Sequence, residues 1–241
     1  MRYSIFLIIL ILIQFDAHAQ KDTIVFNSFI VTFENYYMTV DSENNSTFFK
    51  KQFTRPYYYT ADADGDGMLE LIVVDSILSK EKSTFYIYIY SGTDEFRLVD
   101  SIYSAAYFPF LSYAEEISSI IIETGNPEFE FFNREDEYYS LPINVWKMED
   151  KKIILVNDEV YEPFLFENAN LVRLLDYYLG SDSAECNEVS AHKNIIASAY
   201  ANYINAGELS LAENFLNKYY SCTDKLDFKQ QILDLIFPKA K

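Results

Sequence analysis

The chain has 241 residues, half of them hydrophobic, and it carries a formal net charge of −18 at pH 7. Its 21 tyrosines and 20 phenylalanines exclude a disordered chain and suffice for the core of one large or two small domains. The acidic balance argues against nucleic acid and anionic membrane as partners, because proteins bind phosphate groups mainly through Lys and Arg.

The first residues have the pattern of a secretory signal. Arg2 precedes an apolar run over residues 5–13, and Ala17-His18-Ala19 supplies the small side chains that a signal peptidase reads. We therefore expect residues 1–19 to be a signal peptide and the mature chain to begin at Gln20. Because the run is about half of the roughly 20 residues that cross a bilayer, we expect an exported protein, periplasmic or secreted, that does not span the membrane.

The next region, residues 20–166, has the pattern of an antiparallel β domain. Segments rich in β-branched and aromatic residues recur at spacings of roughly 10 to 20 residues. They are 23–33, 46–53, 69–74, 83–90, 95–103, 117–122, 128–132 and 151–157.

The segment 83–90 predicts a strand that is covered on both sides. Its period of two produces one aromatic set and one largely aliphatic set, which point to opposite faces: Tyr86, Tyr88 and Tyr90, and Phe85, Ile87 and Ile89. The tyrosines of this face and of residues 57–59 have rings that suit sugar stacking, but packing against neighbouring strands is the interpretation we favour.

Residues 62–70, with the sequence DADGDGMLE, predict a calcium loop. Two carboxylates about 4 Å apart repel by roughly 4 kcal/mol at an effective dielectric of 20, so this density of acids favours a bound cation. Calcium takes six to eight oxygen ligands. Four side chains would bind the ion from positions 1, 3, 5 and 9 of the loop: Asp62, Asp64, Asp66 and Glu70. The carbonyl of Met68, at position 7, would be the fifth ligand, and Gly67 would provide the sharp turn.

Two other structures have part of this pattern, a metal-free turn and an EF-hand loop. A solvated Asp-Gly turn without metal leaves the acids unexplained but stays open. An EF-hand does not fit, because its twelfth position is a bidentate Glu where this chain has Val73, and because the residues that follow the loop form an apolar strand rather than a helix.

A loop that closes on an acid at position 9 and runs directly into a strand resembles the calcium loop of FG-GAP or VCBS repeats, the blade units of integrin-type β-propellers. The resemblance covers about residues 55–103. It implies Ca²⁺ as the cofactor, the same five ligands, and small or partial propeller-like sheets. The segment 123–132 has the shape of a degenerate second loop without aspartates, and we expect no metal there.

After residue 167 the apolar period changes to about 3.6, which predicts a helical region over 167–241. Four stripes of apolar residues indicate four helices, within 171–178, 195–204, 211–219 and 226–237. The second and third stripes are separated only by a short Ala-Gly-Glu connection at 206–208, which predicts an antiparallel helical hairpin. The predicted fold class is therefore α+β, with an antiparallel β region followed by a C-terminal helical segment.

The chain has two cysteines, Cys186 and Cys222. One precedes the predicted hairpin and the other follows it, so both fall at its open end. The expected export favours a disulfide between them, and a pair of small buried thiols is the alternative. We expect His192, the histidine of the mature chain, to be an exposed helix residue rather than a catalyst.

No nucleophile elbow, zinc-protease motif or P-loop occurs, so we expect that the protein is not an enzyme. The first functional hypothesis is an exported, non-catalytic binding or scaffold module of the cell envelope, with a structural Ca²⁺ and a protein or glycan partner. The alternatives are an inhibitor of an envelope enzyme such as lysozyme, or a glycan-acting hydrolase that uses two carboxylates.

Overall fold

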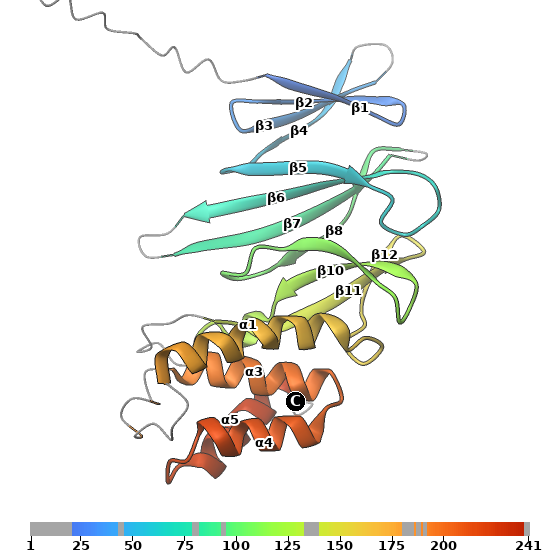
Figure 1. Ribbon diagram of the computed structural model, residues 1–241. Helices are drawn as coiled ribbons and strands as arrows, with labels where there is room; N and C mark the ends of the chain where they lie inside the picture. The colour runs from blue at the N-terminus through green and yellow to red at the C-terminus, as the bar shows by residue number, and fades with distance from the viewer. Residues whose placement is uncertain are drawn as a thin grey trace, which may run out of the picture.

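The computed structural model describes residues 21–42, 46–78, 82–92, 95–132, 140–179, 192–238 and the single residues Cys186 and Val189. The predicted signal peptide, residues 1–19, lies outside these described residues. Within them the fold is α+β as predicted: three antiparallel sheets of four strands are followed by C-terminal helices, with no closed barrel in the described part (Figure 1).

Each sheet consists of four strands consecutive in sequence, so every strand pairs with its neighbour along the chain. The first sheet contains β1 (Asp22–Phe26), β2 (Phe29–Glu34), β3 (Tyr37–Asp41) and β4 (Thr47–Gln52). The middle sheet contains β5 (Pro56–Ala61), β6 (Glu70–Leu78), β7 (Ser83–Ser91) and β8 (Arg97–Tyr103). The third contains β9 (Phe110–Ala114), β10 (Ser119–Gly125), β11 (Ile143–Glu149) and β12 (Lys152–Leu155).

The three sheets are stacked face to face, and apolar side chains fill the space between them (Figure 1). Tyr90 of the middle sheet packs in the layer shared with the first sheet. Ile87 and Ile89, from the opposite face of the same strand, pack in the layer shared with the third sheet. The prediction that both faces of 83–90 are covered is therefore confirmed.

Two predicted strands differ from the structure. Residues 23–33 form a hairpin rather than one strand, because the chain reverses at Asn27, whose φ of 53° suits a tight turn. Residues 128–132 are not a strand: a 3-10 turn, η1 (Pro127–Phe129), begins where the Asn126 side chain accepts a hydrogen bond from the Glu128 amide. Strands β3, β5, β9 and β11 were not among the predicted segments.

The helices are α1 (Glu162–Leu179), α3 (Lys193–Asn205), α4 (Leu209–Tyr219) and α5 (Lys225–Ile236). The first begins ahead of the expected boundary at residue 167. Helices α3 and α4 form the predicted hairpin, and the turn between them contains Gly207 at a φ of +74° (Figure 1).

His192 differs from its prediction. Its residue is only 8% exposed, because it lies at the N-terminus of α3 with its ring 5.3 Å from that of Tyr178. In the described part of the chain, no helix combines the length and the apolar character needed to cross a bilayer.

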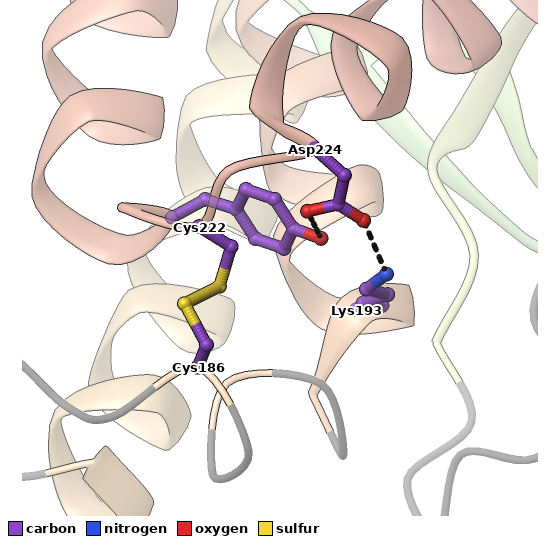
Figure 2. The surroundings of a disulfide bond; sticks show 5 residues. Cys186, Lys193, Cys222 and Asp224 are labelled. Carbon is purple, nitrogen blue, oxygen red and sulfur yellow. Dashed lines mark hydrogen bonds and ion pairs between the residues drawn. A yellow bond between two sulfur atoms is a disulfide. The ribbon is translucent and has the colours of Figure 1, made fainter.

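The predicted disulfide between Cys186 and Cys222 is present, with a Cα–Cα distance of 5.5 Å (Figure 2). It lies at the open end of the α3–α4 hairpin. Beside it, the Lys193 ammonium lies 3.1 Å from Asp224, which also accepts a hydrogen bond from the Tyr220 hydroxyl (Figure 2). The bridge therefore joins the chain before α3 to the segment that leads from α4 to α5.

Reduction of this disulfide is expected to lower the free energy of unfolding by about 3 to 4 kcal/mol, because the closed loop restricts the unfolded chain. Urea unfolding with and without reductant measures the difference. The double variant Cys186→Ser, Cys222→Ser serves as the control and should match the reduced wild type. Equal stability of oxidised and reduced protein would contradict the prediction.

Candidate metal centre

The candidate metal loop, residues 62–69, joins strands β5 and β6 of the middle sheet. The two strands pair antiparallel with Ala61 opposite Glu70, so the register itself returns Glu70 to the start of the loop. Gly65 and Gly67 have φ values of +75° and +84°, a region that favours glycine, and a Cβ at either position would meet nothing within 4 Å. Backbone conformation, rather than crowding, is therefore the reason for the two glycines.

Three of the four predicted carboxylates come together. Asp62, Asp64 and Glu70 each offer one oxygen atom, and these atoms all lie within 4.8 Å of one another. Glu70 is buried, with 2% of the residue exposed, while the two aspartates are half-buried. The cluster thus has an enclosed base and an outer rim that ions can reach.

The other two predicted ligands lie elsewhere in the loop. Asp66 is exposed and is outside the three-residue group; its Oδ1 accepts a hydrogen bond of 2.7 Å from the Met68 amide. Met68 is also exposed. In this structure Asp66 therefore stabilises the turn, whereas the carboxylates of the group face one another.

The loop's own amides satisfy one oxygen of each grouped carboxylate. Glu70 Oε2 accepts from the Ala63 amide at 2.9 Å, Asp62 Oδ2 from Gly67 at 3.1 Å and Asp64 Oδ1 from Asp66 at 3.2 Å. Asp62 Oδ1, in contrast, is a buried oxygen without a hydrogen-bond partner. A buried acceptor left unsatisfied costs about 1–3 kcal/mol, so the loop presents an anionic oxygen that a cation would satisfy.

Burial and the neighbouring aspartates disfavour the charged forms of Glu70 and Asp64. Burial raises the pKa of Glu70 to about 7; the charges of the three loop aspartates add to this, and the Ala63 amide partly opposes it. The pKa of Asp64 is also raised, first by burial and then by Asp66 and Asp62, against the stabilising Asp66 amide. The loop therefore carries a destabilising excess of negative charge.

The donor set determines which metal fits. All three side chains offer hard carboxylate oxygens, and the group contains no Cys or His, the ligands that select zinc or copper. Three carboxylates supply at most six of the oxygens that calcium takes, and backbone carbonyls or water complete such sites. The donor set therefore fits hard divalent cations, Ca²⁺ among them, for which Asp62, Asp64 and Glu70 would supply the side-chain ligands.

The segment 123–132 is expected to be metal-free. It contains a buried glycine, Gly125, and an Asn126 side chain whose oxygen already accepts a hydrogen bond from the Glu128 amide. A Cβ on Gly125 would lie 2.8 Å from the Ser104 carbonyl oxygen, so only glycine fits there. The Asn126 side chain caps the 3-10 turn. The absence of metal from this segment stays a prediction.

Sequence reasoning missed a second feature, a cavity between β9 and the start of α1 that contains Glu123. Glu123 is buried within β10, whereas the sequence pattern assigned it to the degenerate loop 123–132, directly after the predicted strand 117–122. A carboxylate that interrupts a run of buried residues is the signal that points to such a position, because a charge is buried only with compensation.

No protein-family model matches this chain, and no curated protein is significantly similar to it in sequence. The case for a metal rests on the loop geometry described above.

Glu70→Gln removes the buried charge and keeps an acceptor for the Ala63 amide. In a chelator at pH 8 this variant is expected to be more stable than the wild type by roughly 1 to 2 kcal/mol, because repulsion from the aspartates is relieved. Urea unfolding in EDTA measures the change. Glu34→Gln, at an exposed position of the first sheet, is the control; a loss of stability specific to Glu70→Gln would contradict the account.

Proposed function

We propose that this protein is an exported, calcium-binding, non-catalytic scaffold or binding module whose single structural Ca²⁺ occupies the loop 62–70. The observation that carries the proposal is that one oxygen each of Asp62, Asp64 and Glu70 lies within 4.8 Å of the others. Asp62 also has a buried oxygen, Oδ1, with no hydrogen-bond partner. The proposal concerns order rather than chemistry: the ion neutralises the loop and fixes its shape.

The position of the loop explains why its order matters. It connects the two strands that begin the middle sheet, and that sheet packs against both of the others. The Asn27 side-chain amide, from the β1–β2 turn, donates a hydrogen bond of 3.2 Å to the Leu69 carbonyl at the end of the loop. A rigid loop therefore stabilises both the middle sheet and its contact with the first sheet.

The resemblance to FG-GAP or VCBS repeats is compatible with this proposal. Residues 55–103, which carry it, coincide with the middle sheet, β5 to β8. A four-stranded antiparallel sheet of consecutive strands is also the form of a propeller blade. We propose that the middle sheet is a blade of this type and that Met68 contributes its carbonyl in the calcium-bound loop.

Two features favour an exported protein. The Cys186–Cys222 disulfide is the kind of bond that persists in oxidising compartments. Calcium sites of extracellular modules bind at about 10⁻⁴ to 10⁻³ M, a range that suits a permanently occupied structural site outside the cytosol. We propose a periplasmic or secreted location on these grounds.

Saturating calcium is expected to stabilise the wild type by about 3 kcal/mol, which raises Tm by about 5 to 10 °C, because only the folded loop assembles the ligands. Thermal melts in 10 mM CaCl₂ and in EDTA measure the shift. Asp64→Ala is expected to melt at the same temperature in both. A wild-type melt that does not respond to EDTA would overturn the proposal.

Asp66→Ala is the matched control in the same loop. Since Asp66 lies outside the carboxylate group, this variant is expected to keep a measurable calcium response, with weaker affinity from the lost negative charge. Calcium titrations followed by Tm compare the two variants. A response abolished equally by Asp66→Ala and Asp64→Ala would show instead that Asp66 is a direct ligand.

A further inference from the structure

A cavity of about 660 Å³ lies between the third sheet and α1, far along the chain from the calcium loop. Much of its wall is aromatic, with Phe110 and Tyr113 from β9, Tyr161 directly before α1 and Phe166 in α1. All four are among the exposed large hydrophobic residues, at 37%, 62%, 49% and 73% respectively. The volume lies within the usual range for small-ligand sites.

Carboxylates form the polar part of the wall. Glu123, from β10, is only 6% exposed, and the Ser112 hydroxyl donates a hydrogen bond to its Oε1. Glu116 accepts hydrogen bonds from the amides of Tyr161 and Glu162 through Oε1, at 3.1 and 2.9 Å. Its other oxygen, Oε2, is buried and has no hydrogen-bond partner. The cavity thus contains a buried acid and a second acid with an unused acceptor.

No cationic side chain balances the carboxylates among the described residues of the cavity wall. Among the described residues that line it there are three glutamates and no Lys, Arg or His. Burial and the nearby Glu167 raise the pKa of Glu123, against the stabilising Ser112 hydroxyl. A neutral ligand would leave this repulsion in place, whereas a cation would relieve it.

Aromatic walls and carboxylates together select one kind of cation. The faces of aromatic rings attract organic ammonium groups, by about 0.5 to 2 kcal/mol each depending on desolvation. The rings also cover the apolar part of a ligand, which a bare metal ion does not have. An ammonium group has three N–H donors and no acceptor, which matches walls that offer acceptors on Glu123 and Glu116.

We propose that this cavity binds a primary ammonium group carried on an apolar stem, the chemistry shared by a lysine side chain and an aliphatic amine. The ammonium group pairs with the buried Glu123, and the stem lies against the aromatic wall. This site is separate from the calcium loop and does not rest on its function.

The first experiment compares n-pentylamine with n-pentanol, which has the same stem without the charge. Isothermal titration of the full chain in EDTA is expected to show saturable binding of pentylamine, at least about tenfold tighter than that of pentanol. The reason is that a hydrogen bond to a charged group contributes more binding free energy than one between neutral groups. Equal affinities, or no saturable pentylamine binding, would overturn the proposal.

Variants locate the site. Glu123→Gln, which keeps the size of the side chain, is expected to weaken pentylamine binding at least about tenfold, whereas the exposed Glu34→Gln leaves it unchanged. Tyr161→Ala, at a residue that is half exposed, is expected to weaken pentylamine binding several-fold. This variant tests the site if Glu123→Gln does not fold. Binding unaffected by the cavity variants would place the amine elsewhere and reject the assignment.

A further pair of probes identifies the source of the cation. N-acetyl-lysine N-methylamide presents a lysine side chain without other charges, and N-acetyl-norleucine N-methylamide is its uncharged control. Tighter binding of the lysine derivative than of pentylamine assigns the cavity to a partner's lysine, and the reverse order assigns it to a free amine. Asp64→Ala is expected to bind both as the wild type does, so failure of the calcium proposal and failure of this one are distinguishable.

Discussion

The repulsion among three carboxylates at one corner of the middle sheet is the constraint on which the rest of the structure depends. Antiparallel pairing places Glu70 opposite Ala61, and the left-handed glycines turn the chain so that Asp62 and Asp64 face it. The folded hairpin therefore creates its own electrostatic problem. A divalent cation bound there would resolve it with oxygens that are already in position, and on the proposed function metal binding and the local fold reinforce each other.

Packed layers connect that corner of the middle sheet to the other two sheets. The middle sheet has an apolar layer on each side, and α1 covers the far face of the third sheet (Figure 1). Phe164 of α1 and Val160, which precedes the helix, belong to the apolar cluster on that face. The outer face of the first sheet has a different character: the hydroxyls of Thr23 and Thr32 lie 3.3 Å apart, and the Lys50 ammonium lies over the Tyr37 ring. A polar terminal sheet and a helical cover end the stack, as terminal units do in repeat proteins.

The sequence predicted those features that depend on local pattern. The period of two in residues 83–90 gave the two-sided burial, the period of 3.6 gave the four helices, and the position of the two cysteines gave the disulfide. Features that depend on contacts between distant segments of the chain could not be predicted from the sequence. Strand β11 contains Asn144 and Lys147, which interrupt its apolar pattern, and its pairing with β10 becomes clear only from the tertiary structure.

The candidate sites show the same division. Spacing alone indicated the acidic loop, but only the hydrogen bonds reveal that Asp66 caps a turn while its neighbours converge. The cavity beside α1 combines residues from β9, β10 and α1, so no single segment predicts it. Burial of His192 likewise depends on Tyr178, which contacts it from another helix.

Equilibrium dialysis of the mature protein against millimolar radioactive calcium tests the central claim most directly. The account predicts one bound ion per chain for the wild type and none for a variant in which both Asp62 and Asp64 are replaced by alanine. A folded wild-type protein that retains no calcium under these conditions would contradict it.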